Sequence, residues 1–339
     1  MKNKIKSIVF TTIFTMAAGL MMTACGSTAG ADADYKVAIV KYVEDASLNQ
    51  IEDAIVKQLE AKGKEKGIKF DIQLYNGQAD STVLNQIADE VVADGVDVVV
   101  PIATPAAVLM QAKTEDTDIK VVFSAVTDPV DAGLVASLDA PGANITGVSD
   151  AIDTEAIMNL ILLQNPEAKT IGLLYNKSEA SSIGSIADAK KFCEDKGLTV
   201  VEKTGTNVSE IQTAASVLAG EGVDAIYTPQ DNTVMQAEMA IFEMFTDAKI
   251  PHFTGADSFA LNGAYLGYGV NYENLGTLTG DMVFDVTTGA TDTATTAVKT
   301  LSDGIITVNT ETAEKLGLDY SIFKDHCTEL KETVTKQEF

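Results

Sequence analysis

The chain alternates short apolar segments rich in Val and Ile with longer segments in which apolar residues recur every three or four positions. The first pattern is typical of strands buried on both faces, and the second is typical of amphipathic helices. Val96–Ile102 is such a strand, and Thr104 and Pro105 follow it closely. Thr104 is expected to cap a helix over Ala106–Lys113, because Thr is a favoured N-cap and Pro a favoured first helical residue. Ligands of open α/β sheets collect where strands end in this way.

The same strand-to-helix unit occurs twice. The segment that begins Gly222-Val-Asp-Ala-Ile-Tyr-Thr-Pro repeats the one that begins Gly95-Val-Asp-Val-Val-Val-Pro 127 residues earlier, with a two-residue slip near the turn. A repeat of this length indicates two similar α/β lobes rather than a solenoid of short units.

The rest of the chain continues the alternation. Further strands are expected at 36–40, 69–75, 120–123, 170–175, 198–203 and 250–254. Further helices are expected at 48–66, 81–93, 155–163, 183–196, 210–219, 233–247 and 275–287. Asp45–Ser47 is expected to cap the first helix, and Gly67 to end it. Strands alternating with helices of this length predict an α/β fold of two doubly wound parallel-sheet lobes joined by a hinge.

Two linker-like stretches predict where the chain passes between the lobes. Asn144–Ser149 follows Pro and Gly, and Ala264–Asn271 is rich in glycine. Lobe one is therefore expected to comprise residues 35–148 plus about 264–290, and lobe two residues 149–263 plus about 291–339. The tail from Ile305 is expected to close on lobe two.

The N-terminus reads as a targeting segment. Residues 1–24 begin with three lysines and continue with the apolar run Ile8–Leu20, as in a signal peptide. Small residues then precede Cys25, and the segment Met22–Ser27 resembles a bacterial lipobox, which implies cleavage before Cys25 and lipidation of its thiol. An ordinary signal peptide with an incidental cysteine is the alternative. Residues 25–34 predict a flexible tether, so we expect an extracytoplasmic protein anchored to the membrane by lipid.

Composition narrows the range of partners. The 339 residues include 24 basic and 49 acidic ones, and the formal charge of −25 leaves no cationic surface for nucleic acid. Every basic residue is a lysine, so the chain lacks the guanidinium fork that binds carboxylates and phosphates. It also lacks Trp, which removes an indole platform for sugars, and its two His argue against a multi-histidine metal site.

Sequence signatures of catalysis are missing as well. The chain has no Gly-x-Ser-x-Gly elbow, phosphate-binding loop, dinucleotide glycine fingerprint or His-Glu-x-x-His motif. We therefore expect no catalytic residues and no cofactor, and a protein that is not an enzyme.

Loops after the predicted strands carry the candidate binding residues. Helix starts and nearby hydroxyls such as Thr104 could hold a carboxylate without arginine, and an Asp could hold an ammonium group. Together they suit a zwitterion such as an amino acid, with Tyr42, Tyr175 and Tyr227 available to wall its side chain. The predicted ligand-binding residues are Tyr42, Ser47, Thr104, Thr127, Asp128, Ser181, Ser182, Asp231, Asn232 and Asp257.

Structural roles are open alternatives for several of these residues. Thr104, Ser182 and Asp231 could simply cap helices, and Asp128 before Pro129 could form a turn. Tyr175 and Tyr227 could belong to the core or a sheet edge. Cys193 and Cys327 could form a disulfide or remain free, and His252 is expected to be structural.

An ordered set of segments resembles one family. The set comprises Ala103–Ala107, Phe123–Val130, Asn144–Ser149, Leu174–Asn176, Glu179–Ser182, Asp231–Thr233, Gly269–Tyr272 and Leu275–Gly276. In this order the segments resemble the ABC transporter substrate-binding lipoproteins of the tryptophan/tyrosine uptake group, which have a type I periplasmic-binding fold. The resemblance extends from about Tyr35 to Leu318.

The resemblance implies capture of a small solute, often an aromatic amino acid, by hinge closure and its delivery to a membrane permease driven by an ATPase. Two segments depart from the family. Glu44–Asn49 lies where relatives often carry His-Pro and Leu-Asp, and Ser181 lies where they usually carry asparagine. The alternatives are a protein of the same fold for a branched-chain amino acid, nucleoside or sugar, or a ligand-sensing receptor subunit.

Overall fold

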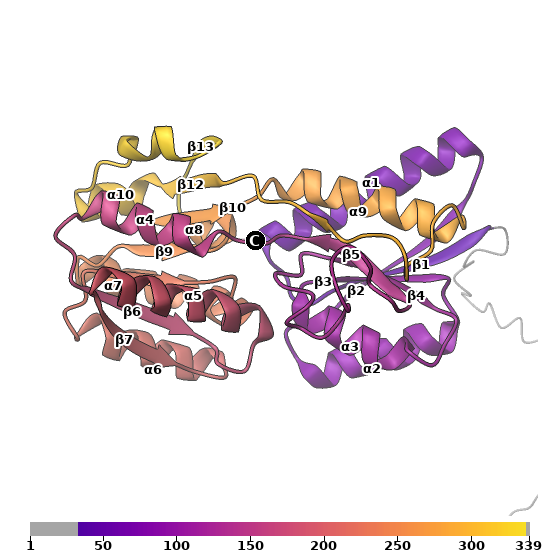
Figure 1. Ribbon diagram of the computed structural model, residues 1–339, viewed down its shortest axis with the longest axis horizontal. Helices are drawn as coiled ribbons and strands as arrows, with labels where there is room; N and C mark the ends of the chain where they lie inside the picture. Colours follow the sequence, from indigo (N-terminus) through magenta and orange to yellow (C-terminus); the bar gives the residue numbers. More distant parts are fainter. Residues whose placement is uncertain (1–32, 337–339) are drawn as a thin grey trace, which may run out of the picture. The chain divides into compact units, whose positions relative to one another are not determined.

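The computed structural model describes residues 33–336, which form two mainly parallel sheets with helices on both faces (Figure 1). The expected signal peptide at 1–24, Cys25 and nearly all of the tether lie outside the described residues. Within residues 33–336, no helix is both long enough and apolar enough to span a membrane. We call each sheet with its helices a lobe.

The sheet of lobe one is entirely parallel. Its strands, in spatial order, are β2 (Phe70–Asn76), β1 (Tyr35–Lys41), β3 (Val98–Ile102), β4 (Lys120–Ser124), β5 (Ile145–Ser149) and β11 (Lys299–Thr300). Its helices are α1 (Ala46–Lys66), α2 (Ser81–Asp94), α3 (Thr104–Thr114) and α9 (Tyr272–Thr287). Alternate residues of β1 point to opposite cores: Val37 and Ile39 pack with α1 and α9, and Ala38 and Val40 with α2 and α3. Both faces of the sheet are therefore buried.

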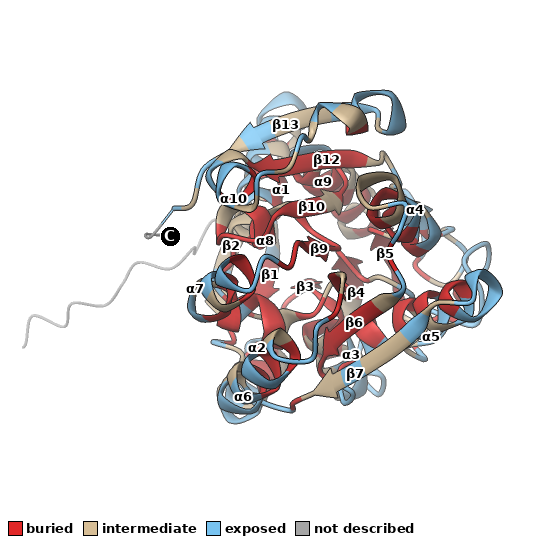
Figure 2. Ribbon diagram, turned by 90° about the vertical axis from the view of Figure 1, so that its left-hand side faces the viewer, coloured by how far each residue is buried: buried red, intermediate tan, exposed pale blue. Residues whose placement is uncertain are grey.

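Lobe two repeats this arrangement and adds strands. Its order is β7 (Thr199–Thr204), β6 (Thr170–Tyr175), β8 (Ala225–Thr228), β9 (His252–Thr254), β10 (Leu266–Gly269), β12 (Ile305–Asn309) and β13 (Glu329–Thr333), with β12 antiparallel to β10. Its helices are α4 (Thr154–Gln164), α5 (Ala180–Lys196), α6 (Val208–Ala219), α7 (Asn232–Asp247), α8 (Asp257–Leu261) and α10 (Thr310–Leu316), followed by a 3₁₀ helix at Ser321–His326. Figure 2 shows the central strands buried and the outer helix faces exposed.

The two sheets share their strand order. In each, the second strand lies at one edge, followed in space by the first, third, fourth and fifth strands of that lobe. The internal sequence repeat falls on β3 and β8, which occupy the same central place in their sheets. The predicted doubly wound fold is thus confirmed.

Sheet membership differs from the prediction at two boundaries. Strand β10, which we placed in lobe one, pairs with β9 and β12 in the second sheet, and β11, which we placed in lobe two, pairs with β5 in the first. The glycines of β10 resemble a linker in the sequence, but in the structure they let another part of the backbone pack closely against the strand. A Cβ on Gly267 would lie 2.2 Å from the carbonyl oxygen of Ala256. The chain passes between the sheets after β5, after β10 and after β11.

The predicted cap of α1 is correct, whereas that of α3 is wrong and α5 begins earlier than predicted. Asp45 caps α1 by accepting from the amides of Ser47 and Leu48, and Gly67 ends it in the left-handed conformation, as expected. The expected Thr104 cap is wrong: Ala103, with φ 81°, precedes the helix, and Thr104 is its first residue with no capping side chain. Helix α5 begins at Ala180, three residues before the predicted start, and places both nearby serines in its first turn.

Candidate ligand-binding site

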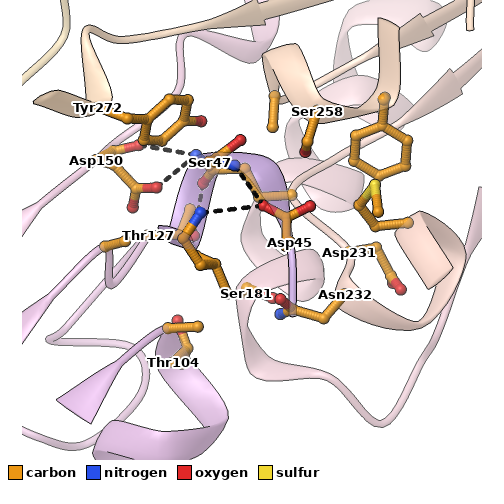
Figure 3. Close-up of a pocket in the computed structure, with 17 residues that line it drawn as sticks. Asp45, Ser47, Thr104, Thr127, Asp150, Ser181, Asp231, Asn232, Ser258 and Tyr272 are labelled. Carbon is orange, nitrogen blue, oxygen red and sulfur yellow. Dashed lines mark hydrogen bonds between the residues drawn. The ribbon is translucent and has the colours of Figure 1, made fainter. Parts of the chain in front are cut away.

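A pocket lies between the strand ends of the two lobes, with an empty volume of about 440 Å³ (Figure 3). Part of this space is open to solvent, and the enclosed part measures about 50 Å³. The lining residues are Asp45, Ser47, Leu48, Ala103, Thr104, Ala125, Thr127, Asp150, Ser181, Gln230, Asp231, Asn232, Met235, Ala256, Ser258, Phe259 and Tyr272. Six of the ten predicted residues are among them: Ser47, Thr104, Thr127, Ser181, Asp231 and Asn232.

The other four predicted residues do not line the pocket. Asp128 is exposed and accepts from the amides of Val130 and Asp131, so the turn is its role. Ser182 is buried behind the pocket, Tyr42 is half-buried against the core of lobe one, and Asp257 faces Ser47.

Three hydrogen bonds join the two lobes around the pocket. Ser47 Oγ in lobe one donates to Asp257 Oδ1 in lobe two over 2.7 Å. Thr127 Oγ1 in lobe one donates to Gln230 Oε1 in lobe two over 2.6 Å. The Nε2 of Gln230 donates in turn to Asp150 Oδ2 over 2.8 Å, at the first passage between the sheets. These side chains close the pocket from both sides.

Two buried carboxylates, Asp231 and Glu179, form a hydrogen-bond network that fixes the lobe-two side of the pocket. Asp231 caps α7 through the amides of Thr233 and Val234, and its other oxygen accepts from Ser182 Oγ and the amide of Asn176. Burial raises the pKa of Asp231, and the four hydrogen bonds oppose this rise because they favour the ionised form. Asp231 therefore both caps a helix, which the sequence analysis left open as its alternative role, and lines the pocket.

Glu179 stands beside Asp231 and was missed by the sequence analysis. It accepts from Ser181 Oγ and from the side chain and backbone amide of Asn232. Burial, followed by repulsion from Asp231, raises the pKa of Glu179 to about 7. Glu179 fixes the two pocket residues Ser181 and Asn232, although it does not line the pocket itself.

Two further carboxylates line the pocket and were also missed as binding residues. Burial raises the pKa of Asp150 to about 7. Burial, with a smaller contribution from the charge of Asp257, raises the pKa of Asp45 to about 6. Asp45 was recognised only as a helix cap, and Asp150 carries no local signal because its partner Gln230 lies 80 residues later in the chain.

Several polar atoms in the pocket have no partner within the protein. Among the described residues, Asp45 Oδ2, Thr104 Oγ1, Asp150 Oδ1 and the Tyr272 hydroxyl are buried without a hydrogen bond. Buried polar atoms without a partner are costly unless a bound molecule satisfies them. None of the described residues that line the pocket is Lys, Arg or His.

The apolar part of the pocket comes from Leu48, Met235 and Phe259, together with three alanines. The tyrosines expected to form a wall lie elsewhere, since the Tyr227 hydroxyl meets Thr154 in the core and the Tyr175 hydroxyl donates to Glu202. Tyr272, the first residue of α9, is the tyrosine that reaches the pocket.

The remaining sequence candidates are structural. His252 is buried, with Nδ1 facing Glu238 and Nε2 facing Thr228, as expected for a structural histidine. Cys193 and Cys327 are free thiols. Within the described part of the chain, no cluster of His, Cys, Asp or Glu has the arrangement needed to hold a metal ion.

Two doubly wound lobes that enclose a polar pocket at their facing strand ends define a solute-binding protein of the type I periplasmic-binding fold. The sequence profile described as ABC transporter substrate binding protein matches residues 36–323. The chain belongs to this family.

Relatives of known structure and function support this assignment. A tyrosine-binding protein of Clostridioides difficile (strain R20291) is 31% identical over 327 residues, which cover 93% of each chain. A Streptococcus pneumonia ABC domain in complex with L-Trp is 31% identical with a TM-score of 0.81, and the match covers 88% of this chain and 100% of that one.

A ligand-free, open substrate-binding protein with adhesive properties from Clostridium difficile is 32% identical with a TM-score of 0.68, over 89% of this chain and 100% of that one. Since the identities are nearly equal, the higher TM-score shows that this structure resembles the L-Trp complex more closely than the open protein.

Proposed function

We propose that this protein is the extracytoplasmic, lipid-anchored binding component of an ABC importer, and that it captures an aromatic amino acid between its lobes. The relatives that bind tyrosine or L-Trp support the ligand class, at 31% identity each. The family supports a permease and an ATPase as partners. The segment around Cys25 supports a lipid anchor.

The observation that carries the proposal is the pocket itself. It combines an apolar wall around Phe259 and Met235 with single carboxylate oxygens and hydroxyls that have no partner in the protein. A zwitterion with an apolar side chain would satisfy both parts. Its polar groups would be bound in a water-poor site, where hydrogen bonds are stronger than in water.

Binding would act on the lobes because residues of both line the pocket. A ligand that contacts Ser47 and Thr104 from lobe one and Asn232 and Phe259 from lobe two binds the closed arrangement better than an open one. A permease could then distinguish loaded from empty protein by the arrangement of the lobes.

Isothermal titration calorimetry of the purified protein with tyrosine, tryptophan, phenylalanine, leucine and adenosine tests the ligand class. We expect saturable one-to-one binding of at least one aromatic amino acid, and weaker or no binding of leucine and adenosine. Binding of leucine or adenosine without any aromatic amino acid would contradict the proposal and favour another ligand of the same fold.

A further inference from the structure

One contact between the lobes joins the first helix of lobe one to the short helix α8 of lobe two. Ser47, the second residue of α1, donates its hydroxyl hydrogen to Oδ1 of Asp257, the first residue of α8, over 2.7 Å. The helix α1 packs on α9 in lobe one, whereas α8 packs on β10 and β12 in lobe two. A hinge motion that parts the lobes therefore breaks this hydrogen bond.

The same serine also binds a carboxylate of its own lobe. Its backbone amide donates to Asp45 Oδ1 over 2.8 Å (Figure 3), so Ser47 links one carboxylate from each lobe. The other direct bond between the lobes, from Thr127 to Gln230, joins two neutral side chains. Because a hydrogen bond to an ionised acceptor is stronger than one between neutral groups, the bond to Asp257 is the stronger of the two attractions.

The contact also carries an electrostatic cost. Burial, followed by the charge of Asp257, raises the pKa of Asp45 to about 6. Burial raises the pKa of Asp257 as well, although the bond from Ser47 and the charge of Lys331 oppose this rise. Both shifts mean that the closed form disfavours the negative charges. Asp257 therefore attracts lobe one through its hydrogen bond and opposes closure through its buried charge.

We propose that the contact between Ser47 and Asp257 sets the balance between the open and closed forms of the ligand-free protein. Ser47 is a positioning residue in this role, since its hydroxyl favours closure whether or not a ligand is present, while the charge of Asp257 limits closure. The contact thereby sets the fraction of molecules in the form that holds ligand. Apparent affinity scales with that fraction, so a change in the balance alters the affinity for every ligand by the same factor.

Two variants separate the hydrogen bond from the charge. Ser47→Ala removes the donor and leaves both carboxylates, so the ligand-free protein should open. Asp257→Asn keeps an oxygen that can accept from Ser47 but removes the charge, so the protein should close further. The radius of gyration from small-angle X-ray scattering at about pH 7.5 should increase in the first variant and decrease in the second. An unchanged or smaller radius for Ser47→Ala, or an unchanged or larger one for Asp257→Asn, would overturn the inference.

Ser47 also lines the pocket, so its contact with Asp257 has to be distinguished from a contact with the ligand. Calorimetry of Ser47→Ala with tyrosine, tryptophan and phenylalanine makes this distinction. We expect affinity to fall by one common factor, up to about tenfold, for each amino acid that binds.

A double variant completes the distinction. Asp257→Ala already lacks the acceptor, so adding Ser47→Ala should cause no further loss of affinity. A loss that differs between ligands, or one that is undiminished beside Asp257→Ala, would show that Ser47 acts on the ligand directly and would contradict the inference.

Ser209→Ala is the matched control. Ser209 is likewise the second residue of a helix, α6, but it is exposed and lies outside the pocket between the lobes. Its replacement should leave both the radius and the affinity unchanged, and unfolding curves of all the ligand-free variants check that they fold.

Only the calorimetric part of the test rests on the proposed function. The scattering measurement needs no ligand, so it tests the inference even if no aromatic amino acid binds. Failure of the proposed ligand class and failure of the inference therefore give different results.

Discussion

At the residue scale, Thr104 lies at the helix start where the sequence analysis placed it, but it does not cap the helix as predicted. Its place between an apolar strand and Pro105 predicted both a helix start and a cap. The helix start is correct, but the preceding Ala103 occupies the cap position, and the Thr104 hydroxyl is left free to face the pocket. Local sequence identifies the helix start, whereas the direction of the hydroxyl depends on the backbone conformation at Ala103.

Thr104→Val tests this role. Since the hydroxyl has no protein partner, its removal should not lower the unfolding free energy, whereas ligand affinity should fall by about tenfold if the hydroxyl binds the ligand. Calorimetry and chemical denaturation measure the two effects. A loss of ligand-free stability, as expected for a helix cap, would contradict the assignment.

Thr114→Val is the matched control for that variant. Thr114 is a buried threonine in the same helix, but its hydroxyl donates to the carbonyl oxygen of Met110 and lies outside the pocket. The expected pattern is reversed, with a stability loss of about 1 kcal/mol and no change in ligand affinity.

At the element scale, α9 completes lobe one from the distant end of the chain. It packs along α1, more than 200 residues earlier in the sequence, as Figure 1 shows. Gly276 and Gly280 lie on the contact face, and a Cβ on Gly276 would come 2.5 Å from the carbonyl oxygen of Ile51. The periodicity of apolar residues predicted α9. It did not predict that α9 packs against α1, because the spacing of the glycines does not identify the neighbouring helix.

Gly276→Ala tests this packing. The added methyl would also lie 2.7 Å from the Cβ of Ala54, so α1 and α9 must separate, at an expected cost of about 1–3 kcal/mol in unfolding free energy. The unfolding free energy is measured in denaturant.

Gly184→Ala provides the matched control in α5. There the new Cβ would meet only Asp131 Oδ2, at 3.8 Å, so the better helix propensity of Ala should leave stability unchanged or raise it by up to about 1 kcal/mol. If both variants lose stability alike, close packing of α9 is not the reason for Gly276.

At the scale of the whole molecule, closure buries carboxylates of both lobes in the pocket or beside it. Asp45 and Asp150 lie in or beside lobe one, and Asp257 lies in lobe two. Burial raises the pKa of each, to about 7 for Asp150 and about 6 for Asp45. When the pocket opens, these carboxyls face water and return toward their ordinary pKa of about 4.

Ligand-free closure should therefore depend on pH. Between about pH 4 and 7 the closed form binds more protons than the open form, so acidification favours closure and alkalinisation favours opening. We expect the radius of gyration from small-angle X-ray scattering to be smaller at about pH 5 than at about pH 8. A saturating ligand should weaken this dependence, because a ligand that bridges the lobes favours the closed form at both pH values. A radius that is constant, or smaller at high pH, would contradict the prediction.

By itself, the sequence determined the alternation of strands and helices, the duplication of the lobe and the absence of arginine. These follow from local periodicity and composition, which act on neighbouring residues. Only the tertiary structure decided that β10 joins the second sheet, and that Asp45, Asp150 and Tyr272 share one pocket with Phe259. Strand pairing and the burial of a carboxylate depend on groups far apart in the chain, and no local pattern records which of them meet.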